Sequence, residues 1–351
     1  MSTLNSSSVS DKTSILIIYT GGTIGMITEP STQALVPVDF KEISSQLPEL
    51  RKFDLQLEPY TFDPPVDSSN ATPDFWVKLA SVIRDEYLHH DGFVVLHGTD
   101  TMCFTASALS FMLENLNKPV VFTGSQLPIG VLRTDGKENL LTAIEIAAEK
   151  RDNQPMVPEV SILFQNKLFR GNRTTKHNAE YFNAFRSENY PCLAEAGIRI
   201  HYNYGAIHYP VNERPLRVHT GLDDHVTLIK LFPGMRRDLL HSMLSVPGLK
   251  GVVLETFGAG NAPTTDWFLD EIREAIESGI LILNVTQCPA GSVDPGKYET
   301  SRLLHETGVL NGRDMTSEAA VTKLMFLFSQ SANPDMLKVY LNKSISGEIS
   351  V

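Results

Sequence analysis

The chain has 351 residues and carries 41 acidic and 30 basic side chains, which give a formal net charge of −11. This length allows one large domain or two ordinary ones, and 42% hydrophobic residues can fill a sizeable core. The negative charge argues against nucleic acid or an anionic membrane as the main partner, because both need a basic protein surface.

The cysteines Cys103, Cys192 and Cys288 are far apart and form no Cys-x-x-Cys pair, so neither a disulfide framework nor a zinc site is expected. Cys288 could act as a nucleophile, but a small buried core thiol is the favoured interpretation. Residues 1–14 are rich in Ser and Thr and lack a signal-peptide core, so they are predicted to be a disordered tail. No apolar run approaches the roughly 20 residues of a membrane span. We therefore expect a cytoplasmic protein.

In the first half of the chain, short apolar runs alternate with amphipathic segments. In chain order they predict strands at residues 14–19 and 92–96, a helix through 109–116, a strand at 119–123, a helix through 140–147 and a strand at 160–164. The strands are apolar throughout, which is typical of a parallel sheet covered by helices on both faces.

Residues 202–224 interrupt this alternation with Gly, Pro, His and charged side chains, and they are predicted to be a linker. Beyond them the predicted elements are a strand at 226–232, a helix at 239–244, a strand at 251–257, a helix at 267–276, a strand at 280–286 and a helical end from Thr316. The prediction is an α/β protein with a disordered tail (1–14), a larger flavodoxin- or Rossmann-like parallel-sheet domain (15–202), a linker (203–224) and a smaller α/β domain (225–351).

Two loops that follow predicted strands are dense in Gly and Thr, at residues 20–25 (TGGTIG) and 97–102 (HGTDTM). Ligands of open parallel sheets bind at the carboxyl ends of the strands. Adjacent glycines let backbone N–H groups approach a ligand, and Asp100 could pair with a substrate ammonium or a lysine. The alternatives are a plain strand-to-helix turn for the first loop, and a helix N-cap supplied by Asp100 or Thr101 for the second.

Two further segments could contribute chemistry. Residues 170–176 (RGNRTTK) follow a predicted strand, although a solvated basic loop is the usual interpretation of such a run. Residues 67–69 (DSS) could equally be a turn in which Asp and Ser bond their own backbone. A dinucleotide-binding oxidoreductase and a two-lobed binding protein remain as alternatives of other classes. The first lacks its glycine fingerprint, because Pro263 stands at the third glycine position after Gly258 and Gly260.

The two Gly/Thr loops together resemble the bacterial-type cytoplasmic (type I) L-asparaginases. Further matching segments are DSS at 67–69, RGNRTTK at 170–176, GNAP at 260–263 and NVTQC at 284–288, so the resemblance covers nearly the whole chain after the tail. It implies hydrolysis of L-asparagine to L-aspartate and ammonia through a threonine-linked acyl-enzyme. It also implies a homodimer or homotetramer, and neither a cofactor nor a metal is expected.

The resemblance also implies roles for individual residues. Thr23 matches the nucleophile, and Thr99, Asp100 and Lys176 match the group that activates it. The substrate-binding residues implied or proposed are Gly22, Asp67, Ser68, Ser69, Thr99, Asp100 and Ser125. Backbone N–H groups near Thr99 and Ser125 are the candidates for stabilising the oxyanion.

Two positions depart from the family pattern. Many members carry a tyrosine on the loop after the nucleophile, and Leu35 stands at the matching position here. Some type I enzymes bind asparagine at an effector site that includes an arginine, and Glu255 matches that position. A carboxylate there would repel the carboxylate of an effector, so allosteric activation is predicted to be weak or absent. A preference for glutamine and a role as an amidotransferase subunit acting on aminoacyl-tRNA remain as related alternatives.

Overall fold

The computed structural model describes residues 12–28, 35–37, 43, 45, 47–210 and 214–350. Most of the predicted tail and the side chain of Leu35 lie outside this part. An eight-stranded sheet forms the N-terminal half, in the order β15-β14-β11-β10-β7-β5-β1-β4. Its parallel strands are β1 (Ser14–Tyr19), β4 (Gln56–Thr61), β5 (Gly92–Leu96), β7 (Val120–Thr123) and β10 (Val160–Phe164). The antiparallel strands are β11 (Lys167–Arg170), β14 (Ala194–Ala196) and β15 (Ile200–Tyr202).

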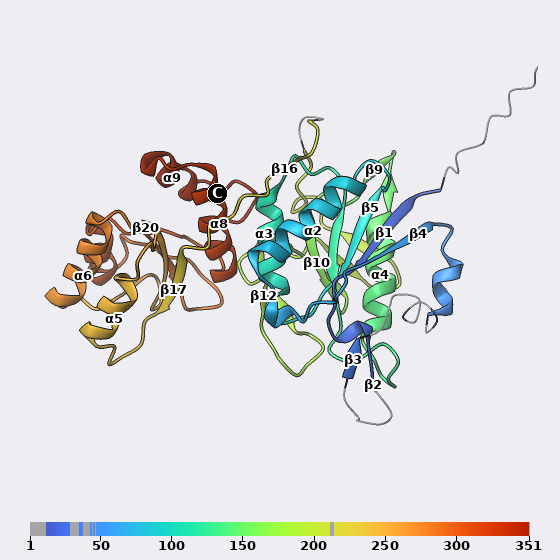
Figure 1. The fold of residues 1–351 in the computed structure, drawn as a ribbon, viewed down its shortest axis with the longest axis horizontal. Coiled ribbons are helices and arrows are strands. Elements are labelled where there is room, and N and C mark those ends of the chain that lie inside the picture. The colour runs from blue at the N-terminus through green and yellow to red at the C-terminus, as the bar shows by residue number, and fades with distance from the viewer. Residues whose placement is uncertain are drawn as a thin grey trace, which may run out of the picture.

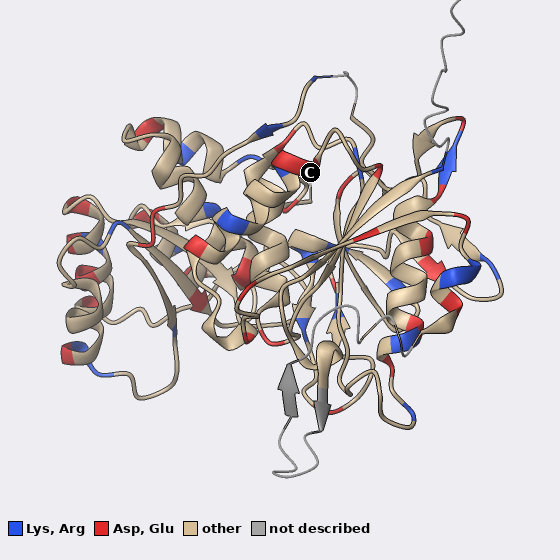
Figure 2. Ribbon diagram, turned by 45° about the vertical axis from the view of Figure 1, so that its right-hand side comes forward, with Lys and Arg blue, Asp and Glu red and all other residues tan. Residues whose placement is uncertain are grey.

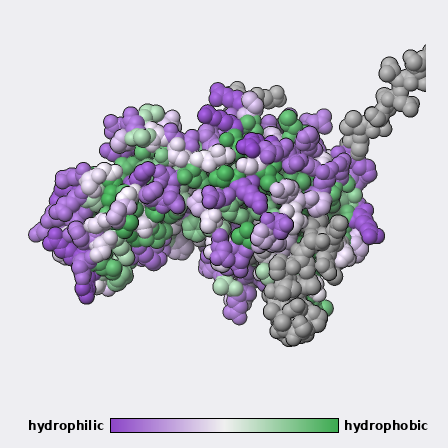
Figure 3. Space-filling view, viewed as in Figure 1, coloured by the Kyte–Doolittle hydropathy of each residue, from purple (hydrophilic) through white to green (hydrophobic). Residues whose placement is uncertain are grey.

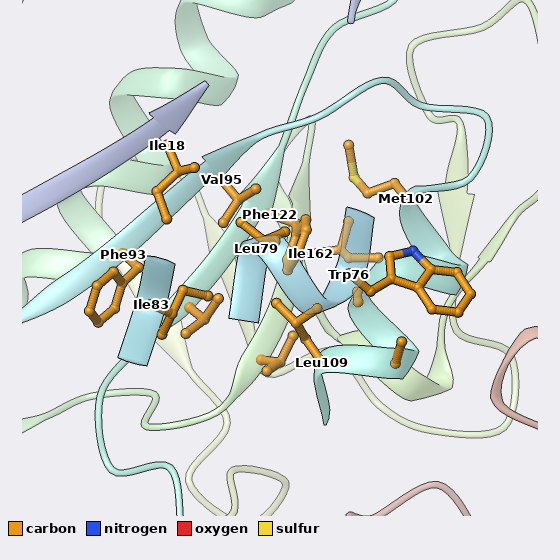
Figure 4. Packing of buried hydrophobic residues seen from close by; sticks show 14 of the residues in the cluster. Ile18, Trp76, Leu79, Ile83, Phe93, Val95, Met102, Leu109, Phe122 and Ile162 are labelled. Atoms are coloured by element: carbon orange, nitrogen blue, oxygen red, sulfur yellow. The ribbon is translucent and has the colours of Figure 1, made fainter. Parts of the chain in front are cut away.

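Helices cover both faces of this sheet (Figure 1). Helices α2 (Pro73–Glu86) and α3 (Met102–Met112) pack on one face, and α4 (Gly136–Ala148) packs on the other. Figure 4 shows the first of these interfaces, where Ile18, Phe93, Val95 and Phe122 of the sheet meet Leu79, Ile83 and Leu109 of the helices. Burial on both faces explains why the central strands are apolar at every position.

The C-terminal half is a second α/β unit with a four-stranded parallel sheet: β17 (Val226–Lys230), β18 (Gly251–Thr256), β19 (Leu281–Thr286) and β20 (Leu310–Asn311). One face carries α5 (Arg237–Leu244), α6 (Asp266–Glu277) and α7 (Glu299–Glu306). The other face carries α8 (Ser317–Gln330) and α9 (Pro334–Leu341). The predicted fold class is therefore confirmed, with one correction: three antiparallel strands extend the first sheet.

The two units meet where α8 packs against α3, and the rings of Phe111 and Phe326 stack there with centroids 6.1 Å apart (Figure 1). Within the predicted linker, β16 (Arg217–Val218) pairs with β6 (Leu113–Glu114). Charged residues of both signs are spread along the ribbon of both units (Figure 2), and hydrophilic residues cover much of the visible face (Figure 3). No helix in the described ranges is long and apolar enough to cross a membrane.

Short elements complete the described chain. The 3₁₀ helices are η1 (Thr23–Gly25), η2 (Pro48–Lys52), η3 (Ser68–Asn70) and η4 (Gly171–Arg173). The short strands are β2 (Met26–Thr28), β3 (Leu35–Pro37), β8 (Lys150–Arg151), β9 (Gln154–Pro155), β12 (Thr175–Lys176) and β13 (Phe185–Arg186). Several of these elements carry the predicted site residues.

Candidate active site

The register of the parallel strands brings four loops to one edge of the sheet. Tyr19 at the end of β1 lies opposite Thr61 of β4 and Leu96 of β5, and Leu96 lies opposite Thr123 of β7. The chain therefore leaves all four strands at the same level. The loops that follow carry the predicted residues Thr23, Asp67 to Ser69, Thr99 with Asp100, and Ser125.

The loop that carries Thr23 is held from two sides. Gly22 has φ +90°, and a Cβ atom there would lie 2.5 Å from the backbone nitrogen of Gly98, so only glycine allows this approach. From the core, the Tyr19 hydroxyl donates to the carbonyl of Gly25 at 3.0 Å, and burial raises the pKa of Tyr19 to about 12. The Thr23 hydroxyl is half-buried and has no hydrogen-bond partner among the described residues.

Lys176 connects the two residues of the second loop. Its Nζ donates to Thr99 Oγ1 at 2.9 Å and to Asp100 Oδ1 at 2.7 Å. The lysine side chain is 19% exposed and that of Asp100 is 65% exposed, so the pair lies at the mouth of the site. Thr99 Oγ1 donates in turn to Gln126 Oε1 at 3.4 Å, a partner that sequence reasoning missed. The structure thus brings Thr99, Asp100 and Lys176 together.

The segment that precedes Lys176 is largely buried, so its interpretation as a solvated basic loop is wrong. Arg170 pairs with Glu159 at 2.6 Å, and both side chains are nearly enclosed. Arg173 pairs with Asp314 of the C-terminal unit at 2.6 Å. These buried ion pairs fix the turn η4, and β12, which carries Lys176, follows this turn.

The Asp67 turn is built as its alternative interpretation predicts. Asp67 Oδ1 accepts from the backbone N–H and the hydroxyl of Ser69, at 2.9 and 2.8 Å, and these bonds lower the pKa of Asp67. The turn also contacts the neighbouring loop. The Thr101 hydroxyl donates to the Ser68 carbonyl at 2.6 Å, and a Cβ on Gly98 would lie 2.4 Å from Ser68 Oγ. Thr101 therefore links the loops and does not cap α3 with its side chain, contrary to that alternative.

Ser125 is buried, and its hydroxyl donates to the Leu127 carbonyl at 2.6 Å. The carboxylate of Asp135 accepts from the N–H groups of Gln126 and Leu127, at 3.0 to 3.1 Å. These bonds fix the loop after β7. The Ser125 hydroxyl already has a protein partner in the Leu127 carbonyl.

The structure also places two residues of the C-terminal unit that the sequence analysis singled out. Cys288 is exposed because β19 ends at Thr286 and the cysteine lies in the following loop, so the expectation of a buried core thiol is wrong. Glu255 lies on β18, where its carboxylate is 3.1 Å from Lys230 Nζ and accepts from Ser317 Oγ at 2.5 Å.

Thr23 follows a glycine turn at the carboxyl edge of a covered sheet, and Gly22 of that turn lies against the Gly98 backbone. The next two residues after Gly98 are Thr99 and Asp100, and Lys176 bonds to both. This arrangement, in a chain of two α/β units, fits the class of amidohydrolases. A family model described as asparaginase, N-terminal, matches residues 14–208. A second, described as glutaminase/asparaginase C-terminal domain, matches residues 225–341. The chain belongs to the asparaginase family.

Individual relatives support this assignment. The chain is 43% identical over 345 residues to L-asparaginase 1 of Escherichia coli strain K12, which covers 97% of this chain and 98% of the relative. It is 42% identical over 361 residues to a 60 kDa lysophospholipase of Mus musculus, covering 96% of this chain and 62% of that protein. The crystal structure of L-asparaginase I from Vibrio cholerae superposes with a TM-score of 0.88 at 39% identity, covering 97% of this chain and 100% of that one.

Proposed function

We propose that this protein hydrolyses L-asparagine to L-aspartate and ammonia, with Thr23 as the nucleophile. The observation that carries the proposal is the double contact of Lys176 with Thr99 and Asp100, next to the glycine turn of Thr23. A threonine hydroxyl is a weak nucleophile until a base takes its proton, and Lys176 with Thr99 is the candidate acceptor.

The reaction would proceed in two halves. Thr23 Oγ1 attacks the side-chain amide carbon of asparagine while its proton passes to the Thr99–Lys176 pair. The tetrahedral oxyanion collapses, the C–N bond breaks, and the leaving nitrogen takes up a proton and departs as ammonia. Water then attacks the acyl-threonine ester and gives a proton to the same base. The bond between the acyl carbon and Thr23 Oγ1 breaks, Thr23 takes that proton back, and aspartate is released. Asp100 would keep Lys176 in place and attract the substrate ammonium.

The substrate-binding roles of Gly22, Asp67, Ser68, Ser69 and Ser125 belong to the same proposal. Backbone N–H groups of the Thr99 and Ser125 loops would stabilise the oxyanion, since such donors act where negative charge develops. The convergence of these loops in register supports the assignment. The Ser125 hydroxyl already donates to Leu127, so its backbone is the better candidate for this contact.

Ammonia release from L-asparagine tests the proposal in the wild type, Thr23→Ala and Lys176→Met. We expect both variants to lose nearly all kcat. Lys150→Met is the matched control, because Lys150 pairs with Asp91 next to the amino end of β5, at the opposite edge of the sheet. Full activity of Thr23→Ala would refute the assignment of the nucleophile.

Glutamine is the comparison substrate, because one methylene changes binding by only about 1–3 kcal/mol. Faster hydrolysis of glutamine than of asparagine would overturn the substrate assignment and leave the threonine mechanism standing. Trapping the Thr23 ester with a slow substrate, followed by mass spectrometry of the peptide, would identify the intermediate directly.

The resemblance suggests further properties, which we also propose: a cytoplasmic location, a homodimer or homotetramer, and a domain division at the 203–224 linker. Light scattering of the purified protein distinguishes a dimer or tetramer from a monomer. Limited proteolysis that cleaves first within the linker and leaves two folded fragments would support the division.

Allosteric activation by asparagine is proposed to be weak or absent, because the Glu255 carboxylate occupies the matching position. The Lys230 partner of Glu255 is 61% exposed and offsets this charge only in part. The rate should therefore rise hyperbolically with asparagine concentration. A sigmoidal rise that becomes hyperbolic in Glu255→Ala would contradict this proposal.

A further inference from the structure

A chain of buried hydrogen bonds runs beneath the loop of Thr99. Trp76 Nε1 lies 3.0 Å from Thr105 Oγ1, Thr105 Oγ1 lies 3.0 Å from His97 Nε2, and His97 Nδ1 lies 2.7 Å from the Gly98 carbonyl oxygen. The three side chains come from α2, α3 and the end of β5. Figure 4 shows Trp76 at the edge of the core cluster.

The groups at the two ends of this series of hydrogen bonds determine which atom donates in each bond. An indole N–H only donates, so Thr105 Oγ1 accepts from Trp76 and keeps its own proton for His97 Nε2. A carbonyl oxygen only accepts, so His97 Nδ1 must carry a proton and donate to Gly98. The imidazole is therefore the neutral tautomer protonated at Nδ1.

The surroundings favour the same state. His97 is 1% exposed and lies edge-on to the rings of Phe75 and Phe122, with centroids 5.5 and 5.9 Å away. Burial lowers the pKa of His97 to about 4. A charged imidazole would donate from Nε2 as well, and the Thr105 proton would then need another acceptor.

The last bond of the chain sets the orientation of one peptide group. The Gly98–Thr99 peptide bond is trans, so the Gly98 carbonyl and the Thr99 N–H point in opposite directions. Because His97 draws the carbonyl toward the core, the N–H faces away from it. No acceptor for this N–H is present in the described ranges. Gly98 itself is confined between Gly22 and Ser68, so the peptide lies where the three loops of the site meet.

We propose that His97 is a positioning residue: through its hydrogen bond to Gly98, the Trp76–Thr105–His97 chain aims the Thr99 N–H at the oxyanion of the reaction. This inference rests on the proposed function. It differs from the simpler interpretation of His97 as a satisfied core histidine, because it predicts a loss of rate that packing alone would not cause.

Two substitutions of nearly equal shape separate these interpretations. Asn at position 97 can still donate to the Gly98 carbonyl, whereas Leu cannot. We expect His97→Leu to lower kcat on asparagine by about 10- to 100-fold, less than the roughly 100- to 1000-fold loss caused by removing an oxyanion donor. KM should change little. His97→Asn should retain most of kcat, although a buried amide makes it the less stable variant. Equal kcat values in the two variants would overturn the proposal. So would a lower kcat in His97→Asn, the less stable variant, than in His97→Leu.

Thr105→Val gives an intermediate case. It removes the donor to His97 Nε2 but leaves Nδ1 free to bond Gly98, so kcat should fall less than in His97→Leu. A larger fall would contradict the proposed order of the chain.

The tautomer can be measured without substrate. Nitrogen-15 NMR of histidine-labelled protein at pH 7 should show a neutral ring protonated at Nδ1, and protonation at Nε2 would refute the direction of the chain. If the tautomer is as stated but the wild type releases no ammonia from asparagine, the proposed function fails and the hydrogen-bond chain stands.

Discussion

Replacing Glu348 with alanine would leave a buried ammonium without its counter-charge. Lys323 Nζ on α8 lies 2.6 Å from Glu348 Oε1, and both side chains are fully buried. The carboxylate also accepts from the backbone N–H groups of Ile345 and Ser346, at 2.8 to 3.1 Å. Breaking a buried ion pair by removing one partner costs about 3–5 kcal/mol. Two amides would lose their acceptor as well, so we expect a loss near the upper end of this range.

Urea unfolding measures this loss, with Trp76 as the fluorescent probe of the first unit and Trp267 as that of the second. The control is the double variant Lys323→Met, Glu348→Gln. It removes both charges and keeps an amide oxygen for the two backbone donors, so most of the lost stability should return. A loss below about 1 kcal/mol for Glu348→Ala would refute the reasoning, because it is less than the pair and its amides should cost.

Three further changes have outcomes that the geometry predicts. Gly22→Ala places a Cβ 2.5 Å from the Gly98 backbone nitrogen, so the two loops must move apart. Steady-state kinetics should show kcat/KM lower by about 100-fold, the usual effect of displacing reacting groups by roughly 1 Å. Thr101→Val removes the bond to the Ser68 carbonyl, and we expect about 1 kcal/mol less stability and a higher KM with little change in kcat. His97 has its pKa lowered from 6.5 to about 4, so the unfolded chain takes up a proton first as the pH falls, and about 3 kcal/mol of stability should be lost between pH 6.5 and 4. Urea titrations at several pH values should show a smaller loss in His97→Asn, and an equal loss would contradict the assignment.

The central strands could be predicted because their sequences are apolar at every position and end at glycine-rich turns. The predicted bounds of β1, β5 and β10 agree with the structure. Strand β4 escaped prediction because it is an edge strand, largely exposed and interrupted by Pro59. The short antiparallel strands beyond β10 carry charged and polar residues and resemble loops in sequence.

The sequence likewise identifies only some residues of the candidate site. Gly/Thr loops after apolar strands identify Thr23, Thr99 and Asp100 as candidates, because strand ends are where such sheets bind ligands. Lys176 could be named only from the family resemblance, since the chain first turns back through an antiparallel strand. The role of His97 depends on hydrogen bonds to Thr105 and Trp76 on two different helices, and no local pattern in the sequence encodes such contacts.

The geometry of Lys176 depends on the second unit as well as on the first. Arg173 lies three residues before Lys176 in the same segment. Its guanidinium donates to Asp314 at 2.6 Å, to the Glu348 carbonyl at 2.6 Å and to Ser350 Oγ at 2.9 Å. All three partners belong to the C-terminal unit, and the last two lie in the segment that Lys323 anchors. Loss of the Lys323–Glu348 pair should therefore displace Lys176 as well as lower the stability of the fold. The reason is that burial of the Arg173 guanidinium is costly without its hydrogen-bond partners, so the side chain and the segment that carries it would move.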